Sequence, residues 1–421
     1  MKTNPISILI AVCTLMFSPL SILAQGSLTP PGAPAPTMVT LQQIEPRVPI
    51  SAAIEITSPG SYYLTGNISV VGRTAIYIAA NNVTLDLNGF TIFSTAGSAS
   101  GSASLVNACT NVSVFNGNIT SSVTYNGATY SGGGFAYGIY SEGNNANIRV
   151  SRITVNGCLD DGINLGINDS SVADSCTVNT VGGVGVLADS VANCTALQCG
   201  NDGIFGIVVQ NCYGSATGND DGVVADTSAI NCYGTCAGNG AGLSTELAEN
   251  CYGYSSSDGI GLDVLYGALN CTGYSSTGEG ISATTAQNCQ GGSSGNNNGI
   301  YTQIAENCQG TSQSGNGIYA INLAENCVGS SNTGTDYGVI SYANAINCVG
   351  FSGNGVGVYA SSIATGCTGT SYGSGAGVQA GIAQTCEGTS DTGTGVVATV
   401  GVACVGFGAH TYSFTYKYNT P

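Results

Sequence analysis

The sequence predicts an all-β protein, a single-stranded right-handed parallel β-helix (solenoid) with coils of about 19 residues and an N-terminal capping segment. Fourteen cysteines recur between Cys158 and Cys404 at intervals of 18 to 21 residues. A glycine followed by an aliphatic residue comes within about ten residues of every one of them up to Cys386. Such an interval holds two or three short strands with their turns, and its variation argues against the six-residue units of left-handed β-helices.

The first 24 residues are predicted to be a signal peptide. Lys2 begins the segment, an apolar stretch follows at 8–17, and Leu23-Ala24 suits cleavage before Gln25. No later apolar run is long enough to span a membrane. We therefore expect a mature protein that is secreted or held at the cell surface.

A proline-rich linker and an N-terminal cap are expected over residues 25–59. Four prolines occur early in this segment, among Gly, Ala and Thr, as in extended linkers. Leu41 and Ile44 suit one turn of a capping helix that Pro46 would end. A cap is needed because the first coil of a solenoid exposes an apolar end.

The solenoid itself is expected in two parts, with long irregular coils over 60–157 and short regular coils over 158–405. In the first part, apolar residues alternate with polar ones at 83–87, as in a strand with one buried face. Residues 406–421 are expected to form a C-terminal capping strand.

One phrase carries a resemblance to a known group of proteins. Residues 79–92 read Ala-Ala-Asn-Asn-Val-Thr-Leu-Asp-Leu-Asn-Gly-Phe-Thr-Ile. This resembles the opening coil of secreted right-handed β-helix proteins of the pectate-lyase-like superfamily, including its carbohydrate-binding and sugar-hydrolase branch with NosD-like members. The resemblance implies the fold. That superfamily includes lyases, hydrolases, tail spikes and adhesins, so activity has to be argued from site residues.

Charge is scarce, at 7% of residues, and the net charge is −17. Residues 153–416 contain no Lys or Arg. Nucleic acids and anionic polysaccharides are bound through cations, so this composition disfavours both as partners. A neutral glycan remains as a possible partner, and nothing in the sequence specifies an oligomeric state.

The fourteen recurring cysteines, here called the Cys ladder, are expected to stack inside the coil as small buried thiols. They are Cys158, Cys176, Cys194, Cys212, Cys232, Cys251, Cys271, Cys289, Cys308, Cys327, Cys348, Cys367, Cys386 and Cys404. Partial disulfides and a metal or haem site are the alternatives. The chain has one histidine, His410, and no Cys-x-x-Cys, so we expect no metal and no cofactor. Cys199 and Cys236 are off the ladder and are interpreted as turn residues able to form a disulfide or an exposed thiol.

An asparagine precedes the ladder cysteine in nine coils. We interpret these residues as structural, because Asn tolerates a left-handed bend and stacked amides can hydrogen-bond along a column. The nine are Asn193, Asn211, Asn231, Asn250, Asn270, Asn288, Asn307, Asn326 and Asn347.

Carboxylates precede the glycine–aliphatic pair in several coils. Asp160, Asp161 and Asp202 are the catalytic candidates, since stacked turns can bring two carboxyl groups to the separation that a glycosidase needs. Asp160-Asp161-Gly162 resembles the paired-Asp element of polygalacturonase-type hydrolases, although that family's Gly-His-Gly and Arg-Ile-Lys elements have no counterpart here. Plain turn structure is the alternative, because Asn298 and Asn316 occupy the same slot.

Tyrosines form the candidate binding surface. Tyr213, Tyr233 and Tyr252 each follow a ladder cysteine, so strand alternation should point them outward on consecutive coils. Tyr254 and Tyr274 form a second column. Outward rings beside Asn, Ser and Thr suit the faces and hydroxyls of neutral sugars. Packing within the sheet is the alternative role for these rings.

The sequence therefore favours an exported, mainly non-enzymatic β-helix that presents a surface to neutral carbohydrate. One alternative is a glycoside hydrolase that acts on a neutral polysaccharide through the turn carboxylates. The other is a purely structural or adhesive rod. The lack of His, Lys and Arg in the coils favours binding over catalysis.

Overall fold

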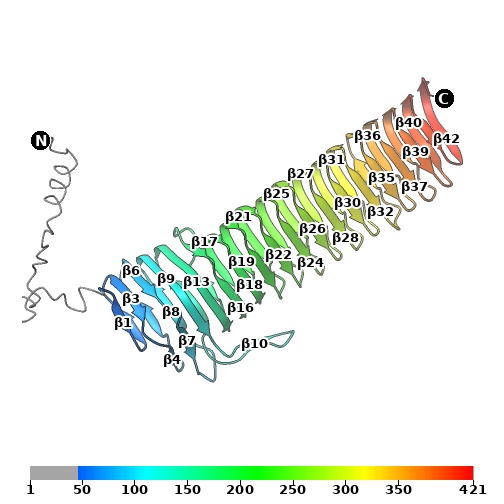
Figure 1. Ribbon diagram of the computed structural model, residues 1–421. Coiled ribbons are helices and arrows are strands. Elements are labelled where there is room, and N and C mark those ends of the chain that lie inside the picture. The colour runs from blue at the N-terminus through cyan, green and yellow to red at the C-terminus, as the bar shows by residue number, and fades with distance from the viewer. Residues whose placement is uncertain (1–45, 421) are drawn as a thin grey trace, which may run out of the picture. The chain divides into compact units, whose positions relative to one another are not determined.

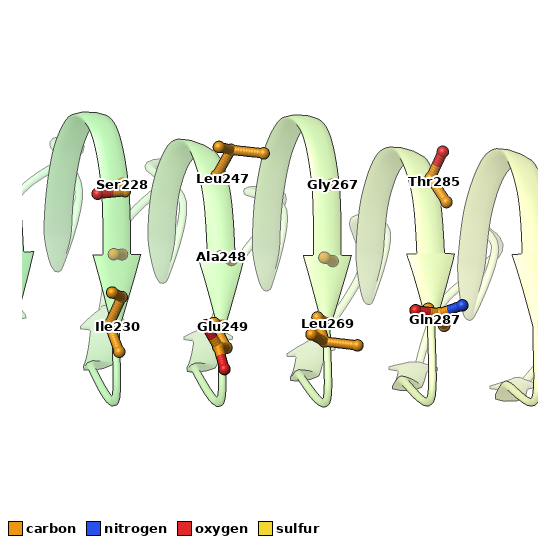
Figure 2. Close-up of a pocket in the computed structure, with 11 residues that line it drawn as sticks. Ser228, Ile230, Leu247, Ala248, Glu249, Gly267, Leu269, Thr285 and Gln287 are labelled. Atoms are coloured by element: carbon orange, nitrogen blue, oxygen red, sulfur yellow. The ribbon is translucent and has the colours of Figure 1, made fainter.

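The computed structural model describes residues 46–420, which form one continuous parallel β-solenoid and contain no helix (Figure 1). Coils stack along a single axis from the first strand, β1 (Val48–Ile50), to the last, β42 (His410–Tyr418). In Figure 2 the near strands run downward while the chain advances to the right, which is a right-handed coil. The predicted fold class is confirmed.

The irregular first coils begin earlier than the expected start at residue 60. β1 pairs with β3, and β2 pairs with β5, because Ile50 and Ile56 already face the core. The predicted signal peptide and the proposed helical turn at Leu41 and Ile44 lie outside the described residues. The strands of these coils are β1, β2 (Ile54–Ile56), β3 (Gly60–Leu64), β4 (Ile68–Val70), β5 (Ile76–Ile78), β6 (Val83–Asp86), β7 (Thr91–Ser94), β8 (Ser102–Asn107), β9 (Thr110–Thr120), β10 (Thr124–Tyr125), β11 (Tyr130–Ser131), β12 (Tyr137–Glu142) and β13 (Ala146–Cys158).

Most regular coils have a long strand, which begins at the aliphatic residue of the glycine–aliphatic pair, and a short strand, which follows the ladder cysteine. The long-strand sheet contains β14 (Ile163–Asn164), β15 (Val172–Asp174), β17 (Val186–Ala192), β19 (Ile204–Gln210), β21 (Val223–Ile230), β23 (Leu243–Glu249), β25 (Leu262–Leu269), β27 (Ile281–Gln287), β29 (Ile300–Glu306), β31 (Ile318–Glu325), β33 (Val339–Ser341), β34 (Asn344–Ile346), β36 (Val358–Thr365), β38 (Val378–Gln384), β40 (Thr394–Val402) and β42. In two coils the long strand is divided, into β14 and β15 and into β33 and β34. The short-strand sheet contains β16 (Thr177–Val181), β18 (Thr195–Cys199), β20 (Tyr213–Ala216), β22 (Tyr233–Cys236), β24 (Tyr252–Ser255), β26 (Thr272–Ser275), β28 (Gln290–Ser293), β30 (Gln309–Ser312), β32 (Val328–Ser331), β35 (Val349–Ser352), β37 (Thr368–Ser371), β39 (Glu387–Ser390) and β41 (Val405–Phe407).

The asparagines form the corner between the two sheets. Asn231 has a φ of 54°, in the left-handed region, and its Nδ2 donates to Asn211 Oδ1 at 3.0 Å. Asn250, Asn270 and Asn288 repeat this bond to the preceding coil at 3.2 to 3.3 Å. The structural role predicted for these residues is confirmed: the left-handed turn lets the chain change sheets while the amides tie successive coils together.

The Cys ladder faces inward, as predicted. All 17 cysteines in the described part of the chain are buried and free. Most ladder thiols lie against backbone carbonyls; the Sγ of Cys308 is 3.2 Å from Glu306 O and 3.3 Å from Ala286 O on the previous coil, and its single S–H can donate to either. The thiols therefore act as small core groups that also satisfy backbone acceptors.

The interpretation of Cys199 and Cys236 as turn residues was wrong. They end strands β18 and β22 and are only 0% and 2% exposed. Strand alternation points them into the core, where Cys236 stands opposite Ser255 of the next coil. The same inward column continues as buried serines: Ser255, Ser275, Ser293, Ser312, Ser331, Ser352, Ser371 and Ser390.

The interior is narrow because glycines bring opposite walls together. A Cβ on Gly253 would lie 2.0 Å from the carbonyl oxygen of Gly261, so no larger residue fits there. Thiols, alanines, serines and short aliphatic chains fill the remaining space. Function must consequently be sought on the outer faces and turns.

The ladder yields a first testable prediction. Cys308→Ala removes one buried sulfur and should lower the free energy of unfolding by roughly 1 kcal/mol. Cys308→Leu overfills the column and should cost more, about 1–3 kcal/mol. Chemical denaturation measures both, and thiol labelling should be slow in the native protein and complete in denaturant. Equal labelling in both states, or a Leu variant as stable as the parent, would place the ladder outside the core.

Candidate functional site

A row of three tyrosine rings runs along the short-strand sheet. Tyr213, Tyr233 and Tyr252 are the first residues of β20, β22 and β24 and stand opposite one another in register. Their ring centroids are 4.9 Å apart between Tyr213 and Tyr233 and 4.4 Å apart between Tyr233 and Tyr252. The rings therefore cover one another's faces and present edges and hydroxyls outward, with Tyr233 39% exposed.

The second tyrosine column adds a ring in a different orientation. Tyr254 and Tyr274 are paired on β24 and β26. A Cβ on Gly292 would lie 2.4 Å from Tyr274 Cδ1, so this ring lies over the space that the glycine leaves on β28. Its centroid is 6.2 Å from that of Tyr252, and its plane is tilted by 48°. We call the five rings, Tyr213, Tyr233, Tyr252, Tyr254 and Tyr274, the tyrosine strip.

Within the strip, the hydroxyl of Tyr252 is a neutral donor and acceptor at physiological pH. Burial raises the pKa of Tyr252 to about 12, and the neighbouring Tyr233 acts in the same direction. A neutral phenol can donate to, and accept from, a sugar hydroxyl.

A shallow apolar groove lies across the corner from the strip, on the long-strand sheet (Figure 2). It has a volume of about 360 Å³ and spans strands β21, β23, β25 and β27. Figure 2 shows Leu247 and Thr285 in one row with Gly267 between them, and Leu269 in the adjacent row. Because Gly267 has no side chain, the row is interrupted there and the groove opens. This groove was not predicted from the sequence. The residue that could have indicated it is Gly267, because the next two coils have Thr285 and Ile304 at the equivalent position.

The groove, the asparagine corner and the strip belong to the same coils. In one coil the order is Ile230, Asn231, Cys232 and Tyr233, so a groove residue, a corner amide and a ring follow one another. The corner residues beside the strip are exposed, and each donates one amide hydrogen to the Asn of the preceding coil, which leaves a second amide N–H for a ligand; they are Asn211, Asn231, Asn250 and Asn270. The three rows form a surface with aromatic, amide and aliphatic parts.

A hairpin that the sequence did not predict borders the short-strand sheet. β10 and β11 pair antiparallel, and Tyr125 stacks on Tyr130 with centroids 4.6 Å apart. The hydroxyl of Tyr130 donates to Gln198 O at 2.9 Å and lies 2.7 Å from Thr217 Oγ1. Thr217 follows β20, the strand that begins with Tyr213. The hairpin therefore contacts the coil that carries Tyr213, the first ring of the strip.

The catalytic candidates are engaged in turn structure. Asp161 accepts the N–H of Val184 at 2.8 Å and the side-chain amide of Asn164 at 2.7 Å. Asp202 accepts the N–H of Asp221 at 2.9 Å on the next coil. Val184 occupies the coil between Asp161 and Asp202, so these two carboxylates are separated by two rises of roughly 4.8 Å each.

The carboxylate column includes three groups whose pKa is raised by burial, Asp160, Asp202 and Asp221. Burial raises the pKa of Asp202 to about 6, and repulsion from the carboxylates of Asp221 and Asp220 acts in the same direction. The hydrogen bond from the N–H of Asp221 has the opposite effect and lowers this pKa. Burial likewise raises the pKa of Asp221 to about 6, with Asp263 and Asp220 adding repulsion. Burial, together with Asp161, also raises the pKa of Asp160. Such shifts accompany catalytic carboxyls, and they also arise wherever like charges stack.

In later coils an uncharged Asn occupies the position of these carboxylates and accepts the same hydrogen bond from the backbone of the next coil. Asn316 Oδ1 accepts the N–H of Tyr337 at 2.9 Å, and its Nδ2 donates to Asn298 Oδ1 at 2.8 Å. Asp221 makes the same backbone contact, accepting the N–H of Ala241 at 2.7 Å. The shared task of this column is to hold the turn of the next coil.

Two features are absent from residues 46–420: a metal-binding cluster of side chains and a helix that could span a membrane. No group of three or more His, Cys, Asp or Glu side chains there is arranged to hold a metal ion. No helix of sufficient length and apolar character to cross a membrane occurs in that range.

No family model matches the chain, and no curated protein matches it. Among solved structures, the mannuronan C-5 epimerase A-module of Azotobacter vinelandii is similar at 13% identity and a TM-score of 0.26, covering 86% of this chain and 90% of that one. The catalytic domain of a GH87 α-1,3-glucanase in complex with nigerose is similar at 11% identity and a TM-score of 0.24, covering 79% of this chain and 58% of that one. Likeness at this level carries no argument about what this chain binds.

The carboxylate column predicts an unusual pH dependence. Asp202 and Asp221 have folded pKa values near 6, above the value of about 3.9 for a free Asp, so the folded state binds protons more tightly. The stability they contribute is complete below about pH 4 and is lost as the pH rises through 6. Lowering the pH from 7 to 5 should raise the free energy of unfolding by on the order of 1 kcal/mol per group.

Asparagine substitutions provide the test by denaturation at several pH values. Asp221→Asn keeps the acceptor for Ala241 N–H, as Asn316 does for Tyr337, and should stabilise the protein at pH 7 and flatten the profile. Asp391→Asn, in an exposed turn, is the control and should leave the profile unchanged. A destabilised Asp221→Asn at pH 7 would mean that this carboxylate needs its charge.

Proposed function

We propose that this protein is an exported, mainly non-enzymatic β-solenoid that binds a neutral glycan along the tyrosine strip, outside the cell or at its surface. Export rests on the predicted signal peptide over 1–24. The phrase at 79–92 supports membership of the pectate-lyase-like superfamily, in the branch with NosD-like members. The observation that carries the binding proposal is the presence of rings, corner amides and the apolar groove on the same consecutive coils.

The surface has the chemistry that neutral sugars need. Tyr274, over Gly292, supplies a ring at the end of the stack, and the stacked edges of Tyr213, Tyr233 and Tyr252 supply hydroxyls. Sugars bind proteins through apolar contact with ring faces combined with hydrogen bonds to their hydroxyls. The coils that carry the strip contain no Lys or Arg, which favours an uncharged ligand.

The geometry also favours an extended ligand. Equivalent residues repeat at roughly 4.8 Å along the axis, so each coil offers nearly the same contacts to successive parts of a chain. A polymer that lies parallel to the axis can use several coils at once, whereas a single sugar can use only one or two. This proposal predicts that each coil contributes modestly to the affinity and that the affinity increases with the length of the glycan.

The tyrosine strip yields a direct test. Replacing Tyr213, Tyr233 and Tyr252 together by Thr, the residue that Thr195 and Thr272 supply at this position, should preserve the coil. Affinity for a binding member of a neutral polysaccharide panel should fall by about 1 kcal/mol per ring. Calorimetry or affinity electrophoresis on glucans, mannans, xylans and galactans provides the measurement.

A matched control comes from the other sheet. Tyr301 and Tyr319 stack with centroids 5.1 Å apart on β29 and β31, away from the strip. Replacing both by Thr removes a comparable stack and should leave glycan affinity unchanged. Unchanged binding in the triple variant, together with lowered stability, would assign the strip to packing alone.

The groove is tested by filling it. A Cβ on Gly267 would contact only Leu247 Cδ2, at 3.6 Å, so a side chain fits there without a backbone clash. Gly267→Thr introduces the residue that the next coil has at the equivalent position, Thr285. It should leave the melting temperature unchanged and lower glycan affinity severalfold. Undiminished affinity would confine the binding surface to the strip and the corner.

The alternative is a glycoside hydrolase that uses Asp160, Asp161 and Asp202. The raised pKa of Asp160 and of Asp202 favours it, because a general acid must hold its proton near neutral pH. Release of reducing ends from the neutral polysaccharide panel would support this alternative, and Asp161→Asn should then abolish release without loss of fold. Absence of release under conditions where binding is measured would leave binding as the function.

A further inference from the structure

Within residues 46–420, the last strand, β42, has one edge to which no strand pairs. β42 pairs in parallel with β40 over nine residues, and with no other strand in the described part of the chain. His410 N–H donates to Gly393 O, and Tyr418 O accepts the N–H of Ala403. Because N–H groups alternate in a parallel ladder, those of Thr411, Ser413 and Thr415 point to the open edge.

Aromatic rings cover the end of the core at this edge. Tyr412 and Phe414 stand opposite Val396 and Ala398 of the preceding coil and are only partly buried. A Cβ on Gly401 would lie 2.6 Å from the ring of Phe414, so that ring lies over the glycine. Phe407 on β41 is 51% exposed. The end thus combines unpaired backbone groups with apolar rings, a combination that promotes strand pairing.

Charge distinguishes this end from the rest of the protein. The chain carries a net charge of −17, yet no Asp or Glu occurs among residues 392–420, where His410 and Lys417 lie. Two copies that met side by side would bring their carboxylates together. Two copies that meet at their C-terminal ends would not.

We propose that two copies of this chain associate tail to tail, with β42 of one pairing antiparallel with β42 of the other about a twofold axis. A twofold contact uses the same surface on both copies, so association closes at a dimer. Pairing satisfies the outward N–H groups of β42 and covers Tyr412 and Phe414. The tyrosine strip lies on earlier coils and stays free, so the dimer would carry two strips and gain avidity for a long ligand.

Light scattering coupled to size exclusion tests the proposal on the chain as expressed, over a range of concentrations. The expected result is a monomer–dimer equilibrium with no larger species, and small-angle scattering should show a particle about twice as long as the monomer at the same cross-section. A monomer at every concentration would overturn the proposal. Open-ended growth would also overturn it, because a head-to-tail contact does not close.

Two variants locate the contact. Thr415→Pro removes an outward N–H at a position where an edge strand tolerates proline, and should weaken dimerisation by about tenfold or more. Phe414→Ser removes a ring that covers the end of the core beside β42 and should also weaken it, whereas Phe407→Ser, at a 51% exposed ring on the outer face of β41, should not. A dimer that survives both Thr415→Pro and Phe414→Ser would place the contact elsewhere.

Discussion

The structure depends on the parallel hydrogen bonding between successive coils. Strand pairing places each residue directly above its equivalent, as Tyr233 stands above Tyr213 and Gly234 above Gly214. Each position therefore has the same surroundings in successive coils, and the same residue type recurs there as a column along the axis. A residue of the wrong size or polarity would affect the packing of the coil before it and of the coil after it. The thiol, serine and asparagine columns are consequences of this single constraint, and so are the tyrosine strip and the carboxylate column.

The same constraint determines where function can lie. Close approach at glycines such as Gly253 keeps the interior narrow, and thiols, alanines and serines fill it. Surface features are then shallow and elongated, as the groove at Gly267 is. Under the proposed function, a solenoid of this kind would offer rows of weak, repeated contacts to a ligand, and the absence of Lys and Arg from 153–416 disfavours an anionic one.

Much of this architecture could be predicted from sequence because periodicity is a property of the chain itself. The cysteine interval predicted the fold, and counting one residue past each ladder cysteine predicted the outward register of Tyr213, Tyr233 and Tyr252. Cys199 and Cys236 were misassigned because the later coils hold serine in the same inward column, which hid the repeat. The stacking of the rings on one another, the groove at Gly267 and the docking of Tyr130 onto Thr217 depend on side-chain packing between distant residues, which a single sequence does not reveal.

The proposed binding of an extended neutral chain along the solenoid axis is tested most directly by measuring affinity against oligosaccharides of increasing length, prepared from whichever neutral polysaccharide binds the protein. Binding along the strip predicts that affinity rises with each added sugar until the oligosaccharide spans the coils from Tyr213 to Tyr274, and then levels off. Affinity that is already maximal for a mono- or disaccharide would instead indicate a compact pocket and contradict the account.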